Sequence, residues 1–394
     1  MLTTSPFHWT SQYFIGFFFA YGVYLPFWAL WFEDQGISAT DIGLLVGIGF
    51  ATRCVANMVI TPRIHKVEQL MPALRWLSIA ALLFVMFHFL ATTSFWLMAL
   101  ATVLFNLCFG PIVPLSDAMA NYYARIKMID YGRTRLWGSV SFIIGSTVVG
   151  YLAAEFGSEM ILYTAAAGML CAILFSMRRI QPMPKTVEKE ATHRPKLGDM
   201  LKDVSVIKFL TLVALIQGSH AAYYGFSAIY WKEVGHAEDT IGYLWSLGVV
   251  AEVAVFAFSK RLFTGWSLRT LFVLASVGVT IRWGLTASTT TLSALILIQL
   301  LHGVTFGVAH IAAIQYIQHS DVNRIVALQA LYNAIPLGAV IALLTALCGW
   351  GYESWGANVF WIMALMGIAA LFIHVEPIRS QPSIIDTETQ NLKQ

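Results

Sequence analysis

Charged residues are scarce in this sequence. Lysine, arginine, aspartate and glutamate make up 11% of the 394 residues, whereas a soluble domain carries about 25% charge. Hydrophobic residues reach 58%, and apolar stretches of about 20 residues, enough to cross a bilayer core of roughly 30 Å, recur along the whole chain. The composition therefore excludes an ordinary water-soluble domain and predicts an all-α membrane protein with many spans.

Signals of several other protein classes are also missing. No lysine or arginine precedes Arg53, so the first apolar segment lacks the basic start of a signal peptide and is expected to remain as a helix. The sequence shows no phosphate-binding loop, nucleophile elbow or metal-ligand cluster, which argues against ATP-driven transport, an enzyme and a metal site. A net charge of +3 gives no sign of a nucleic-acid partner. The cysteines lie in apolar runs without paired spacing and are interpreted as reduced core residues: Cys54, Cys108, Cys171 and Cys348.

Hydropathy predicts twelve transmembrane helices, six in each half of the chain. The first six are expected near residues 11–32, 41–64, 73–91, 95–117, 136–155 and 160–177. The second six are expected near residues 207–231, 240–260, 268–286, 292–317, 325–348 and 357–374. The predicted regions are an N-terminal six-helix bundle over 1–177, a cytoplasmic linker over 178–206, a C-terminal six-helix bundle over 207–376 and a cytoplasmic tail over 377–394.

The basic residues predict the orientation of these spans. If the N-terminus is cytoplasmic, all of the 24 lysines and arginines except Arg53, Lys232 and Arg282 fall in cytoplasmic segments or at the adjoining helix ends. The opposite loops carry acids instead, such as Asp34 and Glu238. This pattern follows the positive-inside rule, so we expect both termini in the cytoplasm.

The two halves repeat short motifs. Arg53 lies eleven residues after the isoleucine of Ile42-Gly43, and Glu252 lies eleven residues after that of Ile241-Gly242. Phe109-Gly110 in the fourth span matches Phe306-Gly307 in the tenth. Two six-helix bundles related by pseudo-twofold symmetry, with a long central loop, resemble the major facilitator superfamily, whose binding sites lie between the repeats.

Charges inside spans are the most specific functional signal. A charge at the centre of a helix costs roughly 2.5–3.5 kcal/mol on insertion scales, so it normally faces a cavity or a partner. Arg53 is a candidate docking group for an anionic substrate, because a guanidinium binds a carboxylate through two parallel hydrogen bonds. The alternative is a structural ion pair. Glu252 is a candidate for proton coupling or substrate contact, and the alternative is a buried structural acid.

Other polar residues in the spans are weaker candidates. Asp117 and Arg135, eighteen residues apart at cytoplasmic helix ends, are candidate gating charges or simply interfacial charges. Arg282 lies deep in the ninth span, and two histidines eight residues apart in the tenth are candidate proton relays or ordinary buried hydrogen-bonding groups. These histidines are His302 and His310. A polar and aromatic cluster in the seventh span is a candidate for substrate binding: Gln217, His220, Tyr223 and Tyr224.

The segment GRTRLWGSVSF resembles lactose permease and its relatives. That resemblance implies coupling between Asp117 and Arg135, and a role in proton coupling for Arg282 and His302. The sequence departs from the family at three positions. The proton-binding glutamate falls at Thr305, the sugar-binding glutamate at Val249, and the sugar-stacking tryptophan at Phe142. These departures argue against a galactoside substrate.

The segments YGVYLPFWALW, HAAYYGFSAIYW and VGYLWSLGVVAEV resemble the 3-phenylpropionate (hydrocinnamate) permeases of enteric bacteria. The resemblance implies a monomeric secondary transporter of the bacterial inner membrane that imports an aromatic carboxylate with protons and without a cofactor. We expect the carboxylate to meet Arg53 or Arg135, and the ring to pack against Phe142, Tyr223 or Tyr224. The alternatives are a proton symporter for a sugar or nucleoside, and a membrane sensor or scaffold without transport.

Overall fold

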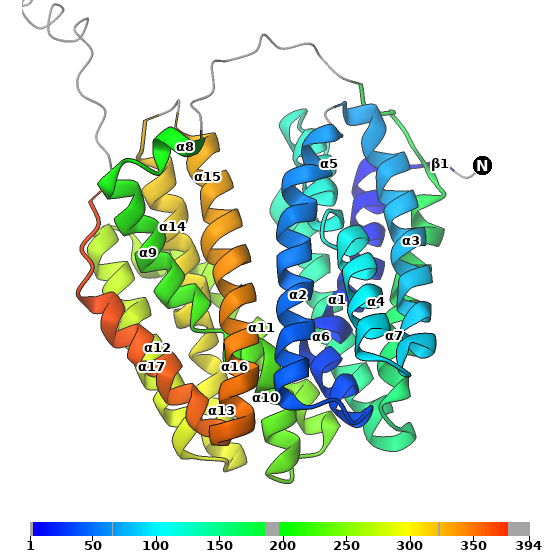
Figure 1. Ribbon diagram of the computed structural model, residues 1–394. Helices are drawn as coiled ribbons and strands as arrows, with labels where there is room; N and C mark the ends of the chain where they lie inside the picture. The colour runs from blue at the N-terminus through cyan, green and yellow to red at the C-terminus, as the bar shows by residue number, and fades with distance from the viewer. Residues whose placement is uncertain (1–2, 65, 186–196, 322–323, 377–394) are drawn as a thin grey trace, which may run out of the picture.

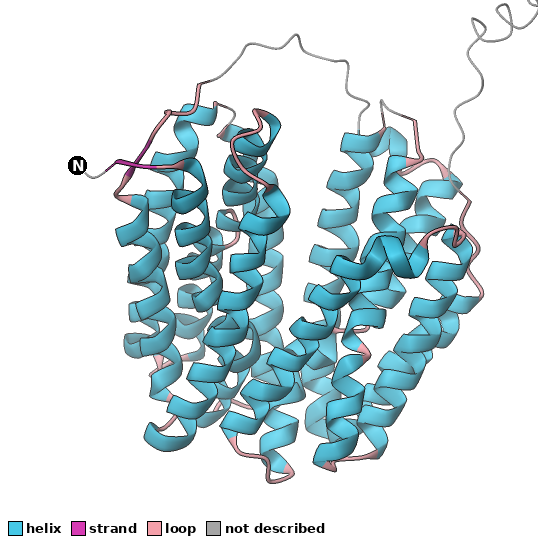
Figure 2. Ribbon diagram, turned by 180° about the vertical axis from the view of Figure 1, so that it is seen from behind, coloured by secondary structure: helices cyan, strands magenta, loops and turns pink. Residues whose placement is uncertain are grey.

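A computed structural model describes residues 3–64, 66–185, 197–321 and 324–376. Long helices dominate this part of the chain (Figures 1 and 2). Within it, 11 helical stretches are long and apolar enough to cross a membrane. One of them, Ile325–Leu371, is interrupted by a turn at Gly356, where φ is +55°, and so accounts for the last two of the twelve predicted spans. The predicted tail at 377–394 lies outside the described residues.

The first half forms one bundle (blue to green in Figure 1). Its helices are α1 (Pro6–Asp34), α2 (Ala39–Val59), α3 (Leu70–Ala91), α4 (Phe95–Phe109), α5 (Ile112–Arg125), α6 (Tyr131–Phe156) and α7 (Glu159–Ser176), with the short turns η1 (Thr61–Arg63) and η2 (Val67–Gln69). The fourth span is longer than the predicted 95–117, because α5 continues α4 beyond the Gly110-Pro111 break to Arg125. Asp117 therefore lies inside this span and does not close it.

The second half forms the other bundle (green to red in Figure 1). Its elements are α8 (Leu197–Met200), α9 (Val204–Gly218), α10 (Ala221–Glu233), α11 (Glu238–Phe263), α12 (Leu268–Ser288), α13 (Leu292–Leu300), η3 (Gly303–Val308), α14 (Ala309–Gln318), α15 (Ile325–Ala334), η4 (Ile335–Val340), α16 (Ile341–Trp355), η5 (Gly356–Asn358) and α17 (Val359–Leu371). Two of these elements, η3 and η4, are π-helices, a geometry that occurs mostly as single turns at functional sites. They interrupt the tenth and eleventh spans at mid-depth.

Side-chain caps start several spans where the sequence changes from polar to apolar. Ser5 accepts a hydrogen bond from the His8 amide at 3.3 Å and is followed by Pro6, a residue favoured at the first position of a helix. Ser38 and Asp130 cap α2 and α6 in the same manner, at 3.2 and 2.7 Å. These caps satisfy amide groups that have no partner inside the helix.

A short strand pair fastens the start of the linker to the first bundle. Strands β1 (Thr3–Thr4) and β2 (Arg179–Ile180) pair in parallel, with Thr3 opposite Arg179 and Thr4 opposite Ile180. The Tyr123 hydroxyl donates to the Pro182 carbonyl at 2.7 Å. The predicted linker at 178–206 is therefore ordered at its start, and the helix α8 lies at its end. The limits of the four predicted regions stay predictions.

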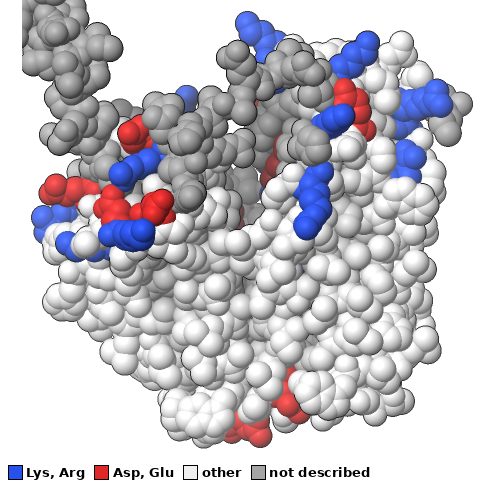
Figure 3. Space-filling model, turned by 45° about the horizontal axis from the view of Figure 1, so that its top comes forward, with Lys and Arg blue, Asp and Glu red and all other residues white. Residues whose placement is uncertain are grey.

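The two ends of the molecule differ in charge. The basic end, named here for the lysines and arginines that gather there, is the upper end in Figure 3. Its residues include Arg63, Arg125, Arg133, Arg178, Lys208, Lys260, Arg269 and Arg324. The acidic end, opposite, includes Glu33, Asp34, Glu155, Glu159, Glu238, Asp239 and Glu353. The broad surface between them shows almost no lysine, arginine, aspartate or glutamate in this view, as expected for a surface in contact with lipid.

The halves are joined at the acidic end. The pairs α2–α16 and α6–α11 cross between bundles, and the ribbons of the two halves converge at that end and diverge toward the basic end (Figures 1 and 2). Glycines permit the close approach: a Cβ on Gly43 would lie 2.5 Å from the Gly349 Cα, and one on Gly242 would lie 2.4 Å from the Ser146 carbonyl oxygen. Small residues at such contacts let helix backbones touch inside a membrane.

Candidate functional site

A cavity of about 340 Å³ lies between the two bundles, on the inner side of the joined acidic end. Figure 3 shows the surface hollowed between the halves at the basic end. The residues that line the cavity come from both halves: Phe18, Tyr21, Leu25, Phe50, Arg53, Cys54, Asn57, Arg135, Ser139, Phe142, Tyr223, Tyr224, Trp245, Val249, Glu252, His302, Phe306, Asn333, Leu337, Gly338 and Ile341. Seven of them are predicted candidates: Arg53, Arg135, Phe142, Tyr223, Tyr224, Glu252 and His302.

Arg53 lines the cavity from α2 among aromatic rings. Its Nη2 donates to the Tyr21 hydroxyl at 2.6 Å, and its guanidinium carbon lies 5.1 Å from the centre of the Tyr21 ring and 5.4 Å from that of Phe50. The buried Nη1 has no hydrogen-bond partner among the described residues. No ion pair joins Arg53 to an acid in this part of the chain, so the alternative of a structural ion pair finds no support there.

The α2 backbone at Arg53 packs closely against Gly110. A Cβ on Gly110, at the break between α4 and α5, would lie 3.0 Å from the Arg53 Cα. A larger residue at 110 would therefore displace α2. The repeated Phe-Gly motif of the fourth span thus has a packing role next to a cavity arginine.

Arg135 lines the cavity nearer the basic end. Its Nε lies 3.7 Å from Asp117 Oδ1, and its guanidinium carbon lies 4.0 Å from the centre of the Phe18 ring. The Tyr131 hydroxyl donates to the same carboxylate oxygen at 3.2 Å. Both charged side chains keep about a third of their surface exposed, 30% and 27%, so this pair is partly hydrated.

Arg282 is the most completely buried charge in the second half, with 0% exposure. Its guanidinium donates to His302 Nδ1 at 2.8 Å, to Thr305 Oγ1 at 3.0 Å and to Gln299 Oε1 at 2.8 Å. Gln299 in turn donates to the Tyr223 hydroxyl at 3.2 Å. We call Arg282, His302, Thr305, Gln299 and Tyr223 the Arg282 network. The network supports the cavity wall from behind, since only His302 and Tyr223 reach the cavity.

Glu252 lines the cavity from α11, opposite Arg53 across the gap between the halves. Its Oε2 lies 3.6 Å from His302 Nε2, and 24% of its side-chain surface is exposed. It is the only acid among the residues that line the cavity in the described part of the chain. Arg53 and Glu252 therefore share one cavity, as their repeat relation suggested, but no ion pair joins them.

Three further predicted candidates lie, like Arg282, behind the wall of the cavity. Gln217 and His220 are buried, and His220 faces Thr305 Oγ1 through Nε2 at 3.1 Å. His310 Nδ1 lies 2.7 Å from the Tyr332 hydroxyl, and a Phe306 ring separates it from His302. The cavity wall does not include Gln217 or His220, and their role in substrate binding stays a prediction.

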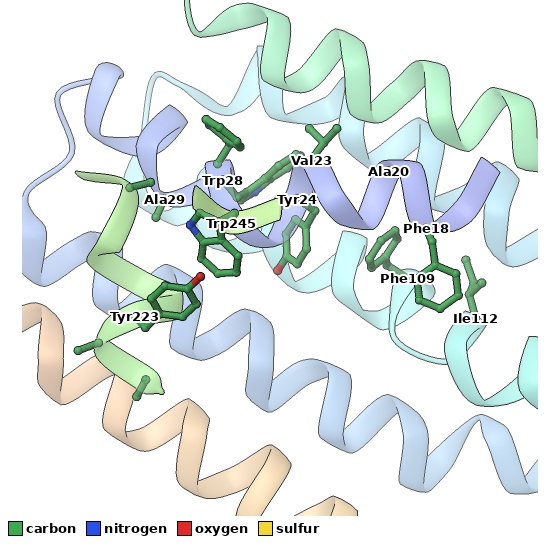
Figure 4. Packing of buried hydrophobic residues seen from close by; sticks show 14 of the residues in the cluster. Phe18, Ala20, Val23, Tyr24, Trp28, Ala29, Phe109, Ile112, Tyr223 and Trp245 are labelled. Carbon is green, nitrogen blue, oxygen red and sulfur yellow. The ribbon is translucent and has the colours of Figure 1, made fainter. Parts of the chain in front are cut away.

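The remaining wall is largely aromatic. Tyr223 stacks on Trp245 with ring centres 4.2 Å apart, and Figure 4 shows the two side chains packed together. On the first half, Phe142 meets Tyr21 edge to face at 5.9 Å. The aromatic core that holds Tyr21 in place continues through α1 and α4, where Phe109 packs on Phe105 and Phe17 (Figure 4 shows Phe109 near Phe18).

Sequence reasoning missed several lining residues. Asn57 follows Arg53 by one helical turn, so the i,i+4 spacing could have placed it on the same face of α2. Asn333 precedes a π-helix and had no such signal, because its orientation depends on an irregular segment. The aromatic lining residues Phe18, Tyr21 and Trp245 are hidden in the sequence among many similar residues in the same spans.

Two helical bundles joined at one end, with a charged and aromatic cavity between them, are the architecture of a transporter of the major facilitator type. The chain belongs to the MFS_1 like family, whose sequence profile matches residues 8–363.

Sequence similarity to known transporters extends over most of the chain. This chain is 40% identical over 374 residues to the "Probable 3-phenylpropionic acid transporter" of Escherichia coli (strain K12), and the aligned region covers 94% of this chain and 98% of that protein. It is 24% identical over 363 residues to the maltose permease of Geobacillus stearothermophilus, with 90% and 91% covered. These relatives are transporters and not enzymes, as predicted for this chain.

Solved structures agree on the fold. The nucleoside transporter NupG matches with a TM-score of 0.78 at 15% identity, covering 94% of this chain and 98% of that one. The POT family transporter PepTSo matches with a TM-score of 0.71 at 11% identity, covering 93% of this chain and 96% of that one. The predicted fold class and the predicted membership of the major facilitator superfamily are therefore confirmed.

Proposed function

We propose that this transporter imports a small aromatic carboxylate, 3-phenylpropionate or a close relative, across the bacterial inner membrane together with protons. Arg53 carries the proposal, because its buried Nη1 has no partner among the described residues and it lines a cavity walled by aromatic rings. The name of the relative that is 40% identical supports the same cargo.

The chemistry of the cavity suits such a substrate. A guanidinium forms two parallel, charge-assisted hydrogen bonds with a carboxylate, and Arg53 has donors left for that purpose. Phe142, Tyr223 and Tyr224 supply ring faces and edges for an aryl group. A volume of about 340 Å³ falls at the small end of ligand pockets, which span roughly 300–1,000 Å³.

The distribution of charge supports the orientation of the transporter in the membrane. Lysines and arginines concentrate in cytoplasmic segments of membrane proteins, so the basic end is assigned to the cytoplasm. The structure is joined at the acidic end, and this state would release a cargo inward. We propose the proton gradient as the driving force, with no cofactor and a single chain as the transporting unit.

Substituting Arg53 tests the proposal. Purified protein in liposomes would be assayed for binding and exchange of labelled 3-phenylpropionate. Removing one partner of a desolvated charge pair costs about 2–5 kcal/mol, so Arg53→Gln is expected to weaken binding roughly 30-fold to several thousand-fold. Arg53→Lys keeps the charge but loses the planar donor pair, and an intermediate loss is expected.

The control for this experiment is Arg269→Gln, which removes an exposed arginine hydrogen-bonded to His374 at the basic end and should bind like the wild type. Unchanged affinity in Arg53→Gln would overturn the docking role. If maltose or nucleosides compete with the label while other arylpropionates do not, the cargo is a sugar or nucleoside. If the wild type binds but moves no substrate, the protein is a sensor or scaffold.

A further inference from the structure

We propose that Glu252 is the group that carries the transported proton, and that Arg282 and His302 position its carboxylate without exchanging protons themselves. This inference rests on the proposed function, because it names the residue through which proton-driven uptake works. Glu252 is the one acid among the described residues that line the cavity, and it lies between the cavity and His302 of the Arg282 network.

The hydrogen bond from Arg282 determines the tautomer and the protonation state of the His302 imidazole. An arginine guanidinium has donors and no acceptor, so His302 Nδ1, 2.8 Å from the Arg282 Nη1, has to accept that hydrogen bond with its lone pair. The single ring proton is then on Nε2, which faces Glu252 Oε2 at 3.6 Å. A second proton would have to enter at Nδ1, where it would break the hydrogen bond and bring two cations into contact. His302 therefore stays neutral and points its Nε2 proton toward Glu252.

The rest of the network has a matching donor for each acceptor. Thr305 Oγ1 accepts from Arg282 at 3.0 Å, so its own proton can be donated to His220 Nε2 at 3.1 Å. The ring proton of His220 is then on Nδ1, 3.1 Å from the Gln217 carbonyl oxygen. Thr305 occupies the position at which the lactose permease resemblance expects the proton-binding glutamate. Both terminal nitrogens of Arg282 have acceptors without an acid there, only its Nε being without a partner among the described residues, and the carboxylate comes from α11 instead.

The other charged or titratable groups that face Glu252 in the described part of the chain are poor proton carriers. Arg135 faces it from α6, and an arginine stays protonated at all physiological pH values. His310 faces it from α14 but is bonded to the Tyr332 hydroxyl behind the cavity wall. Tyr223 and Tyr224 face it from α10, and a phenol ordinarily titrates near pH 10.

The balance of buried charge favours one proton for each monoanion. Asp117 is paired with Arg135, so Arg53, Arg282 and a deprotonated Glu252 leave one positive charge around the cavity before substrate binds. A substrate carboxylate bound to Arg53 and a proton added to a Glu252 oxygen cancel each other. The loaded and empty carriers then have equal charge, and uptake is electroneutral.

Glu252 also lies on a helix that closes the acidic end. The helix α11 runs without interruption over Glu238–Phe263. Nearer its start, Gly242 packs on the Ser146 backbone and the Ser246 hydroxyl lies 2.9 Å from that of Ser146. A change of charge at Glu252 therefore acts on the same rigid helix that forms the α6–α11 junction between the halves.

Glu252→Gln tests the assignment in liposomes, with labelled 3-phenylpropionate as the probe. In the wild type, a gradient of one pH unit should drive accumulation toward a limit of about tenfold for one proton per anion. Glu252→Gln should accumulate nothing above equilibrium and still exchange external label for internal substrate. Glu155→Gln, an exposed acid at the acidic end, is the matched control and should accumulate like the wild type.

His302→Gln separates the positioning role from the carrier role, since an amide supplies both a donor and an acceptor. It should transport more slowly but reach the wild-type accumulation limit. Loss of accumulation in His302→Gln with exchange retained, or full accumulation in Glu252→Gln, would overturn the assignment. If Glu252→Gln does not fold, Glu252→Asp has to shift the pH profile of exchange, and an unchanged profile overturns it. A wild type that exchanges no substrate would instead overturn the proposed function.

Discussion

The acidic and basic ends of the molecule are held in different ways. At the acidic end, contacts run between the halves: Lys232 bridges Asp34 of the first half, at 2.8 Å, and Glu238 of the second, at 3.1 Å. The Thr40 amide donates to Glu353 Oε2 at 2.9 Å across the same junction. At the basic end, the ion pair between Arg324 and Asp203, at 2.7 Å, lies within one half.

This difference indicates which contacts a transport cycle has to break. Alternating access requires the junction at the acidic end to open. The free energy of the contacts between the halves there therefore affects the balance between the conformation closed at that end and the one open at that end. Contacts within a half move with that half as a rigid body, so their energy bears on folding. Substitutions at the two ends should therefore separate these effects.

The largest effect is expected where the two backbones touch. Gly43→Val would place side-chain atoms where a Cβ already lies 2.5 Å from the Gly349 Cα. Overpacking of this kind costs about 1–3 kcal/mol, which would shift the population away from the joined acidic end roughly 5- to 150-fold. Spin labels at Glu159 and Ser354 would report the separation of the halves at the acidic end. Ala51→Val, on the exposed face of α2, is the control. Unchanged distances between the labels in Gly43→Val would contradict the prediction, because they would show that the junction accommodates the larger side chain.

A smaller shift is expected from the bridging lysine. Lys232→Gln removes the cation between Asp34 and Glu238, which belong to different halves. With 33% of its side-chain surface exposed, Lys232 is partly solvated, so a loss of about 0.5–1 kcal/mol and a two- to fivefold population shift are expected. The same label pair would measure it, and Lys232→Arg should restore the wild-type distances. A shift as large as that of Gly43→Val would mean that charge rather than packing holds the end together.

The spans could be predicted well from the sequence because runs of about 20 apolar residues seldom occur in a soluble domain. Equal offsets within the repeat predicted Arg53 and Glu252 at equivalent positions of the two halves, and both line the same cavity, while their roles stay predictions. The sequence could not show that Arg53 keeps an unpaired Nη1 while both terminal nitrogens of Arg282 have hydrogen-bond partners. That distinction depends on which neighbours the helix rotation brings within hydrogen-bond distance.

The π-helices mark a second limit of the sequence. The eight-residue spacing of His302 and His310 predicted two histidines on roughly one side of a helix, and their rings do stack in line through Phe306 although η3 lies between them. His302 reaches the cavity, whereas His310 bonds Tyr332 behind it. A π-helical turn shifts the register of the residues that follow it. No residue type in GVTFGV indicates that this segment forms one.

The smallest effect is expected from Asp203, and it should appear in stability alone. The hydrogen bond from Arg324 holds the pKa of Asp203 below its ordinary value of 3.8, so the stabilisation is present above that pH and is lost as the pH falls through the lower pKa of the folded state. Asp203→Asn should lower the free energy of unfolding by about 0.2–1 kcal/mol at neutral pH, since both partners are about a third exposed.

Because asparagine also caps helices, Asp203→Asn should keep the cap that Asp203 provides to the Ser205 amide, while Asp203→Ala should lose about 1 kcal/mol more. Thermal unfolding in detergent at pH 7 and near pH 3 would measure both, and the difference between Asp203→Asn and the wild type should shrink at the lower pH. The spin-label distances at the acidic end should stay as in the wild type. A changed distance would show that the basic end also sets the conformational balance, and the contrast between the two ends would fail.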